Sequence, residues 1–252
     1  MAVFSDELCV CGAQVEIGPA RQSFWALLER ESGRLRERTR LLPRRGELLL
    51  RRAGDGDGAG ALWISDPGRG VALELALTEQ PGVEALCAHG TQRVWTRKQA
   101  GIRARGTVAL DGGPARELEG RAVIDDTCGH HARVTEWRWS AGVGEAADGR
   151  AVAWNLVSGV NDPPTGSERA IWIDGTPEEP APVSFADDLS AVRFAGGEQL
   201  SFHAEAERAR HDRLIVLESE YRAPFGSFSG TLPGGIELAG GSGVMEHHRA
   251  RW

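Results

Sequence analysis

Alternation of apolar and polar residues with a period of two is the feature that most restricts the fold of this chain. It recurs in segments such as residues 71–78 (VALELALT) and 102–110 (IRARGTVAL), and turn-forming Gly, Pro, Asp and Ser residues separate these segments. A period of two places successive side chains on opposite faces of a β-strand. The turn signals, among them GDGDGAG at 54–60 and LPGG at 232–235, recur at roughly the 8–12-residue spacing of sandwiches and barrels. The pattern therefore predicts an all-β, antiparallel protein.

One segment, SFWALLERESGRLRERTRLL at residues 23–42, is compatible with either a helix or a β-hairpin. Ser32 and Gly33 fall in its middle, and strict alternation follows, so we expect the hairpin. One strand face would then carry Arg34, Arg36, Arg38 and Arg40. That face is either an ordinary solvated surface or a basic wall that attracts an anionic ligand.

The length of 252 residues is long for one domain and short for two full ones. The Gly- and Ala-rich segment 140–150 separates two groups of predicted strands. We therefore expect an N-terminal β domain at residues 1–145 and a C-terminal β domain at residues 146–252.

Charge and composition limit the partners. The net charge of −7 disfavours nucleic acid, and no apolar run approaches the ~20 residues that a membrane-spanning helix needs. Asp6 and Glu7 stand where a secretory signal would need a basic end, so we expect a cytoplasmic protein. Cys9 and Cys11 form a lone C-x-C motif, for which a reduced pair near a mobile terminus is favoured over a metal site.

The densest group of polar and aromatic residues lies at 123–142 (VIDDTCGHHARVTEWRWSAG). If its second half is a strand, one face carries His131, Arg133, Trp137 and Trp139. A mixture of aromatic and polar side chains on one face is typical of a ligand cavity, whereas a plain core strand has one clean apolar side. The alternative is an edge strand with two half-buried tryptophans.

Asp125 and Asp126 end the preceding predicted strand and face opposite ways, so only one of them can point into a cavity. An aspartate in an apolar, Trp-rich cavity would have a raised pKa and could act as a general acid. The alternative, equally compatible with the sequence Asp-Asp-Thr-Cys-Gly, is that both aspartates cap a turn.

Familiar catalytic motifs are missing from the sequence. His130-His131 and Glu246-His247-His248 are adjacent residues whose side chains diverge on a strand, and no H-E-x-x-H or comparable ligand set accompanies them. No G-x-S-x-G motif is present, and the Gly-rich stretches do not join a strand to a helix. We therefore expect no metal and no cofactor.

Several residue types are nearly eliminated from this Arg-rich chain. Lys98 is the only lysine, Tyr221 the only tyrosine, and Asn155 and Asn161 the only asparagines. The few remaining residues of these types are either needed for function or retained by chance. The segment 167–175 (SERAIWIDG) would place Glu168, Trp172 and Asp174 on one strand face, in a structural polar network or in contact with a ligand.

These segments, in order, resemble a known group of proteins. WTRK around Lys98, VIDDTCGHH, TEWRWSAGVG, WNLVSGVND, SERAIWIDG, APFGSFSG and GVMEHHRARW are similar to those of a bacterial family of unknown function related to hydroxyneurosporene synthase and AttH-like proteins. The resemblance extends from about Phe24 onward and implies two lipocalin-like β-barrel or sandwich domains in tandem.

The resemblance also implies chemistry, because relatives of this architecture include carotenoid hydratases and cyclases. It makes Asp125 the candidate catalytic acid, although the acidic motif of the hydratases has no residue-by-residue match here. Trp137 and Trp139 would stabilise a developing carbocation through their π faces. The complete expected ligand-binding set is Lys98, His131, Arg133, Trp137, Trp139, Asn155, Glu168, Trp172, Tyr221 and Glu246.

Three functions remain open from the sequence. The first is acid-assisted, cofactor-independent hydration, isomerisation or cyclisation of a small lipophilic metabolite, isoprenoid or polyketide-like, in a Trp-lined cavity. The second is a non-catalytic carrier or sensor of a lipophilic ligand. The third is a structural module with a filled core.

Overall fold

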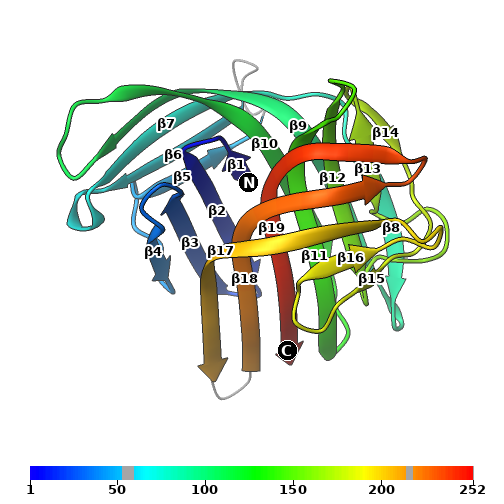
Figure 1. Ribbon diagram of the computed structural model, residues 1–252. Helices are drawn as coiled ribbons and strands as arrows, with labels where there is room; N and C mark the ends of the chain where they lie inside the picture. Colours follow the sequence, from blue (N-terminus) through cyan, green and yellow to red (C-terminus); the bar gives the residue numbers. More distant parts are fainter. Residues whose placement is uncertain (53–59, 214–217, 252) are drawn as a thin grey trace. The chain divides into compact units, whose positions relative to one another are not determined.

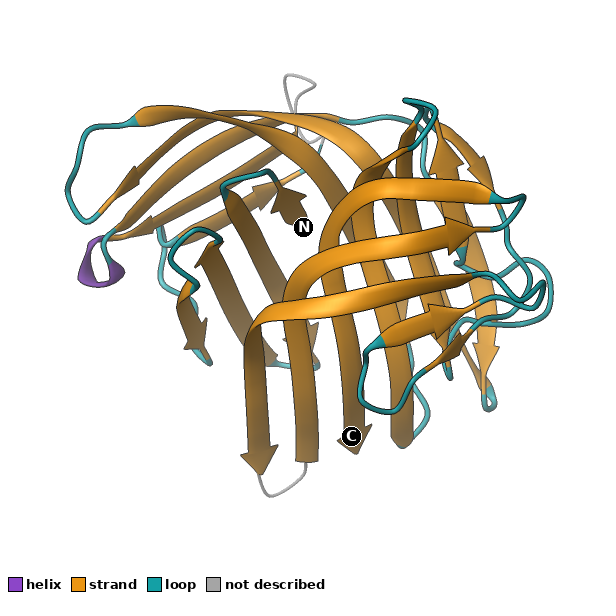
Figure 2. Cartoon of the chain, viewed as in Figure 1, coloured by secondary structure: helices purple, strands orange, loops and turns teal. Residues whose placement is uncertain are grey.

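The computed structural model of the chain describes residues 1–52, 60–213 and 218–251 and is built almost entirely of β-strands (Figure 2). The one helix in this described part of the chain is a single 3₁₀ turn, η1 (Pro67–Arg69). Its cap, Asp66, accepts a hydrogen bond of 3.2 Å from the backbone nitrogen of Arg69. The predicted all-β class is confirmed. The turn signal GDGDGAG lies, except for its last glycine, outside the described residues.

The first antiparallel sheet has ten strands, in the order β4-β3-β2-β1-β10-β9-β7-β6-β5, and β8 pairs with β9 (Figure 1). Their bounds are β1 (Ala2–Phe4), β2 (Leu8–Ile17), β3 (Ala20–Glu29), β4 (Arg34–Arg40), β5 (Leu48–Arg51), β6 (Gly60–Asp66), β7 (Val71–Thr78), β8 (Val83–His89), β9 (Gln92–Leu110) and β10 (Arg116–Gly129).

The second antiparallel sheet has nine strands, in the order β14-β13-β12-β11-β19-β18-β17-β16-β15. Their bounds are β11 (Val134–Ala146), β12 (Ala151–Ser158), β13 (Ala170–Ile173), β14 (Thr176–Glu178), β15 (Ser184–Phe185), β16 (Ala191–Arg193), β17 (Gln199–Arg213), β18 (Glu218–Leu232) and β19 (Ile236–Arg251). The sheets curl, as the long strands of Figure 1 show, and the tandem lipocalin-like class is confirmed.

The hairpin expected at residues 23–42 is present as β3 and β4, with Leu28 opposite Leu35. The N-terminal segment differs from expectation, because Cys9 lies fully buried in β2 rather than near a mobile terminus. The sequence reading missed β2 because small and β-branched residues there are buried on both faces, without clean alternation.

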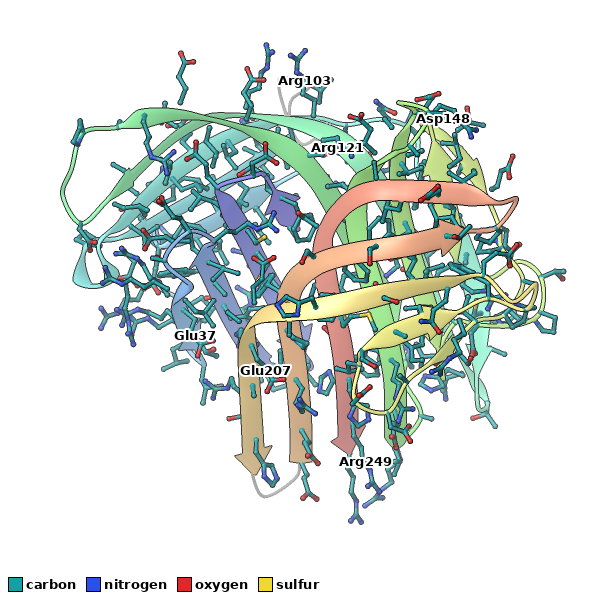
Figure 3. The ribbon with its side chains drawn as sticks, viewed as in Figure 1. Glu37, Arg103, Arg121, Asp148, Glu207 and Arg249 are labelled. Atoms are coloured by element: carbon teal, nitrogen blue, oxygen red, sulfur yellow. The ribbon has the colours of Figure 1, made fainter. Side chains whose placement is uncertain are left out.

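The described residues form two compact units that alternate along the chain. The first comprises Met1–Pro81 and Ile102–Val123, and the second comprises Gly82–Gly101 and Ile124–Trp252. The expected boundary at residues 145 and 146 falls within the second unit. There β11 extends to Ala146, and in the turn that follows Asp148 accepts a 2.8 Å hydrogen bond from Arg150 (Figure 3).

The second unit buries one face of its sheet in an apolar core. Trp154, Leu156, Ile171, Phe228 and Met245 belong to this core, and each is less than a tenth exposed. Side chains alternate along a strand, so the residues on either side of Met245 point to the opposite face. That opposite face carries the candidate site.

The four arginines of β4 do not form an unpaired basic wall. Arg36 lies 2.7 Å from Glu29 and 2.6 Å from Asp111, Arg40 lies 3.0 Å from Glu47, and Arg34 lies 3.0 Å from Asp111. Arg38 pairs with Asp66. Each arginine of this face therefore has a carboxylate partner within the first unit.

Candidate functional site

The register of three neighbouring strands gathers aromatic and titratable side chains on one sheet face. Trp139 of β11 lies directly opposite Glu246 of β19, and Trp137 lies opposite His248. Tyr221 of β18 is also opposite His248, on its other side. Residues paired directly across antiparallel strands share a face and lie within contact distance. The predicted common face of Trp137 and Trp139 is therefore present in the strand pairing.

Glu246 is the carboxyl group at the centre of this face. Its Oε1 accepts a 2.7 Å hydrogen bond from Nε1 of Trp137, and Tyr221 also hydrogen-bonds to the carboxylate. Burial raises the pKa of Glu246 to about 7, because loss of water penalises the charged form more than these two donors stabilise it. The residue is nevertheless partly exposed. Glu246 can therefore give or accept a proton near neutral pH.

His248 lies between two aromatic rings. Its ring centroid is 4.3 Å from that of Trp137 and 5.4 Å from that of Tyr221, and Nε2 lies 2.8 Å from Oγ of Ser219. Burial, with the nearby charge of Arg208 among the other causes, lowers the pKa of His248 to about 4. The imidazole is therefore neutral at neutral pH and available as a proton acceptor.

A buried ion-pair network lies beside this face. The ammonium of Lys98, on β9, is 2.5 Å from Oδ1 of Asp125 on β10 and 3.3 Å from Oε1 of Glu168. Burial lowers the pKa of Lys98, but the two carboxylates outweigh that effect and raise it, so the lysine stays charged. Burial raises the pKa of Glu168 despite the neighbouring ammonium.

Both asparagines of the chain belong to this network. Asn155 accepts a 2.8 Å hydrogen bond from Nε1 of Trp139 and donates one of 2.9 Å to the backbone oxygen of Glu168. Asn161 donates a 2.8 Å hydrogen bond to Oε2 of Glu168. Trp139 is thereby connected to Lys98 through Asn155 and Glu168.

Electrostatics joins the network to Glu246. The charge of Asp125 raises the pKa of Glu246 and that of Lys98 lowers it. The charge of His131 likewise lowers the pKa of His248. Trp139, which lies opposite Glu246, also bonds Asn155 of the network, so the network and the aromatic face adjoin within the second unit.

Some expected site residues lie elsewhere or in other surroundings. Arg133 is exposed in the turn before β11, and Trp172 is 3% exposed on β13, opposite Ala153. The His131 ring packs edge-on against His89 at 5.3 Å. The Asp125 side chain is 37% exposed and pairs with a cation, in contrast to the apolar surroundings expected of it.

The placement of Glu168 on one strand with Trp172 and Asp174 is wrong. β13 spans only Ala170–Ile173, and Glu168 lies in the irregular segment before it. Sequence reasoning also missed His248, Ser219 and the hydrogen bond of Asn161 to Glu168. The signal for His248 was its spacing of two residues from Glu246, which places both on one strand face.

No group of three or more His, Cys, Asp or Glu side chains within the described residues has an arrangement that could hold a metal ion. Nor is any helix in this part of the chain long and apolar enough to cross a membrane.

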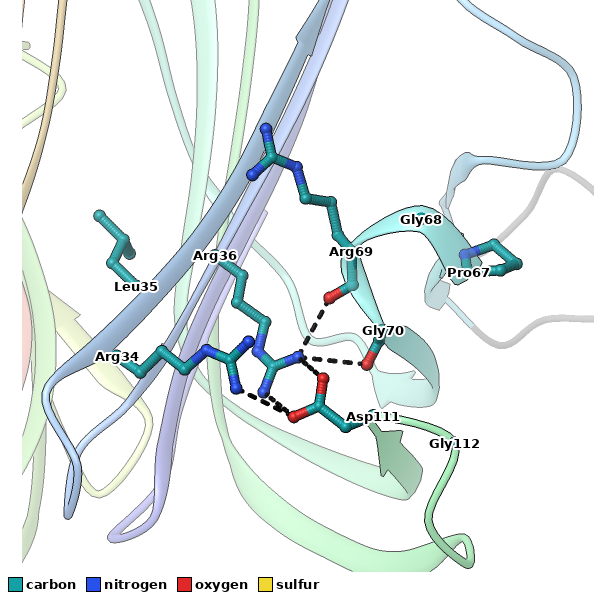
Figure 4. Close-up of a pocket in the computed structure, with 9 residues that line it drawn as sticks. All are labelled: Arg34, Leu35, Arg36, Pro67, Gly68, Arg69, Gly70, Asp111 and Gly112. Carbon is teal, nitrogen blue, oxygen red and sulfur yellow. Dashed lines mark hydrogen bonds and ion pairs between the residues drawn. The ribbon is translucent and has the colours of Figure 1, made fainter.

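An open pocket of about 640 Å³ lies in the first unit and includes none of the residues above (Figure 4). It is lined by Arg34, Arg36, the η1 turn and Asp111. Arg36, only 4% exposed, bonds Asp111 at 2.6 Å and the backbone oxygen of Arg69 at 3.0 Å. Because Arg34 and Arg36 are already paired with Asp111, we interpret this pocket as a structural feature that ties β4 to the turn after β9.

Solved structures share the fold of the chain. A crystal structure of a protein described as AttH, from Nitrosomonas europaea, superposes with a TM-score of 0.59 at 14% identity, over 95% of this chain and 86% of that one. Kievitone hydratase from Nectria haematococca gives 0.58 at 12% identity, over 98% and 86% of the two chains. The protein CghA gives 0.50 at 10% identity, over 99% and 86%.

A family model matches residues 61–252, well over half of the chain, and is described as "Domain of unknown function (DUF2804)". None of the curated proteins with which the chain was compared matches it in sequence.

Proposed function

The chain belongs to the DUF2804 family, and from that membership and the surroundings of Glu246 we propose that it is an enzyme for acid-assisted hydration, isomerisation or cyclisation of a small lipophilic molecule. The observation that carries the proposal is the placement of Glu246, whose carboxylate bonds the indole of Trp137 and which lies opposite Trp139 in the strand pairing. These surroundings raise its pKa to about 7. A group that is half protonated near neutral pH is suited to general acid catalysis.

In a hydration, protonated Glu246 gives its proton to one carbon of a substrate double bond, and the neighbouring carbon becomes cationic. A water molecule adds to that carbon, and the proton that this water loses returns to the Glu246 carboxylate, which restores the acid. The net change is addition of one water. In an isomerisation the cation instead loses a proton from a different carbon.

The tryptophans would stabilise the cationic stage. Both indole N–H groups are engaged, by Glu246 and Asn155 respectively, so each ring is fixed by its polar edge. The π face of an indole attracts a positive charge by up to ~2 kcal/mol or more when water is excluded. Trp137, Trp139 and Glu246 are all partly exposed, which leaves room for substrate atoms to reach them.

Asp125 is the alternative proton donor. Its carboxylate is engaged by the Lys98 ammonium at 2.5 Å, so we assign the acid role to Glu246 and the role of counter-ion to Asp125. The relative named kievitone hydratase supports hydration as the reaction type, through its fold only.

The proposal is tested on the lipophile that the protein itself retains. Native mass spectrometry of purified protein identifies a bound compound, which is then incubated in ¹⁸O-labelled water with wild-type protein, Glu246→Gln and the control Glu136→Gln. Glu136 lies on the other face of the same sheet, 3.0 Å from His247. We expect conversion by wild type and Glu136→Gln, and none by Glu246→Gln.

Equal conversion by both variants would remove Glu246 from the mechanism, and conversion lost only in Asp125→Asn would transfer the acid role to Asp125. A compound that is recovered unaltered from every protein would show a carrier instead.

A further inference from the structure

Glu168 has an unusually complete set of contacts for a residue outside regular structure. It lies between β12 and β13 and is only 3% exposed. Its backbone N–H donates to the oxygen of Asn161 at 3.1 Å, and its backbone oxygen accepts from Nδ2 of Asn155 at 2.9 Å. Its carboxylate oxygens contact Nδ2 of Asn161 at 2.8 Å and Nζ of Lys98 at 3.3 Å. Both its backbone and its side chain are therefore fixed.

The three partners of Glu168 are the only lysine and the only two asparagines of the chain. Asn161 adopts a left-handed conformation with φ of 50°, which asparagine tolerates better than most residues. This conformation brings both the backbone oxygen and the side chain of Asn161 onto Glu168. Asn161 is thus a local clamp for a buried carboxylate.

On one side, Glu168 holds a cation. The Lys98 side chain is 3% exposed, and its second carboxylate partner, Asp125, is 37% exposed. A buried ammonium stays charged when nearby carboxylates offset its loss of water. Glu168, whose side chain is 4% exposed, is the buried one of the two carboxylates that do so.

Through its backbone oxygen, Glu168 also helps to fix the indole of Trp139. Trp139 donates to Asn155 at 2.8 Å, and Asn155 is fully buried and donates in turn to the Glu168 backbone oxygen. A displacement of Glu168 would leave Asn155 with an unsatisfied donor, and Asn155 would then no longer fix the indole.

We infer that Glu168 is a positioning residue that holds the Lys98 ammonium and the Trp139 indole in one fixed arrangement, each through its own contact. The effect of this arrangement on catalysis rests on the proposed function, in which Lys98 and Trp139 belong to the site of the catalytic acid Glu246. The arrangement itself can be tested without a substrate.

A matched control is available in the same segment. The carboxylate of Glu179 accepts hydrogen bonds from the backbone nitrogens of Gly166 at 2.9 Å and Ser167 at 2.8 Å, and from Oγ of Ser167 at 2.6 Å. Glu179→Gln therefore changes a carboxylate of the same segment and removes none of the contacts that Glu168 itself makes.

The experiment uses two resonances that the composition makes easy to assign. Protein grown with ¹⁵N-lysine has a single side-chain ammonium signal, that of Lys98, and the indole N–H of Trp139 is assigned by its loss in Trp139→Phe. Glu168→Gln should shift the Lys98 titration to lower pH. Glu168→Ala keeps the backbone oxygen that Asn155 bonds but removes the side-chain contacts that fix this segment. The segment should then move and weaken the bond to Asn155, which should accelerate hydrogen exchange of the Trp139 indole about fivefold, the effect of one hydrogen bond.

Glu179→Gln should leave both signals in place. Unchanged signals in the Glu168 variants, or equal changes in Glu179→Gln, would overturn the inference. If the Glu168 variants do not fold, Asn161→Ala removes the clamp and leaves the charge; it should accelerate the Trp139 exchange, and an unchanged rate would likewise overturn the inference. Because none of these measurements involves turnover, the outcome is independent of whether Glu246 is the catalytic acid.

Discussion

Nε1 of Trp137 lies 2.7 Å from Oε1 of Glu246, across the pairing of β11 with β19. The indole donates to the carboxylate and so favours its ionised form, yet burial has the larger effect and raises the pKa of Glu246 to about 7. The hydrogen bond from Trp137 therefore lowers the pKa of Glu246, whereas burial raises it. Substitutions can measure the two effects separately.

The pH dependence of stability should report the burial of Glu246. Its pKa in the folded protein, about 7, exceeds the ordinary value of 4.5, so the folded state binds more protons between these values than the unfolded state does. The free energy of unfolding should therefore fall as pH rises from about 4.5 to about 7, by up to ~3 kcal/mol from this group. Urea unfolding of wild type and Glu246→Gln at about pH 5 and about pH 8 checks this.

Glu136→Gln is the control for that comparison. A hydrogen bond from His247 lowers the pKa of Glu136, so this carboxyl titrates below the pH window. Because the lowered pKa of His248 adds stability as pH rises through the same window, the quantity to compare is the difference in free energy of unfolding between wild type and each variant. That difference should fall by up to ~3 kcal/mol between about pH 5 and about pH 8 for Glu246→Gln and stay constant for Glu136→Gln. A constant difference for Glu246→Gln would show that the pKa of Glu246 is not raised in the folded protein.

Asp125 and Lys98 should shift the pKa of Glu246 in opposite directions. Removal of the negative charge in Asp125→Asn should lower that pKa, and removal of the positive charge in Lys98→Met should raise it. Carbon-13 NMR of the Glu246 carboxyl group in each variant measures the two shifts. Shifts of the same sign would mean that both variants act by local rearrangement rather than by charge.

The two tryptophans should respond differently to replacement by phenylalanine. Trp139→Phe leaves the buried oxygen of Asn155 without its donor and should cost about 1–2 kcal/mol of stability. Trp137→Phe removes a donor from a carboxyl group that can take up a proton instead, so its main effect should be a pKa of Glu246 above about 7. Urea unfolding and the carboxyl titration compare the two variants, and equal stability losses with an unchanged pKa would contradict this account.

The sequence predicted which side chains share a strand face at this site, but it did not predict their contacts with residues of other segments. Alternation by two residues predicts that Trp137 and Trp139 share a face, and the pairing of β11 confirms it. The contact of Lys98 with Glu168 joins residues far apart in the chain, and it depends on an irregular segment that no periodicity describes. Local patterns fix the direction of a side chain, whereas its partner depends on sheet order.

The choice of acid illustrates the same limit. Asp125 stood out because it lies in the densest polar stretch, yet its ion-pair partner is Lys98, 27 positions earlier in the sequence. Glu246 gave a weaker signal in sequence, since its burial depends on strands β11 and β18, which flank β19 in the sheet. Composition did carry information, because the only lysine and both asparagines meet at Glu168.

Asp111 should stabilise the first unit in a pH-dependent way. Hydrogen bonds from Arg36, with a smaller contribution from Arg34, lower the pKa of Asp111 to about 2. A lowered carboxyl pKa adds stability above the ordinary value of 3.8, and this stability is lost as pH falls towards about 2. Asp111→Asn, which keeps a residue tolerant of the left-handed φ of 52°, should therefore be destabilised at about pH 6 and approach wild type at about pH 3. A difference in urea midpoint that does not depend on pH would contradict the role of the charge.

Gly142 should be intolerant of even one added carbon atom. A Cβ at this position of β11 would collide with the ring of the core residue Trp154 and would lie 2.8 Å from the backbone oxygen of Ser242. Overpacking of this kind costs typically ~1–3 kcal/mol, so Gly142→Ala should lower the free energy of unfolding by at least that order. Gly240 of β19 is the matched control, since a Cβ there meets nothing within 4 Å, and Gly240→Ala should change stability by less than about 0.5 kcal/mol. Similar urea midpoints for the two variants would show that Trp154 can move aside, and that the core on this side of the sheet is less tightly packed than the contacts of Gly142 imply.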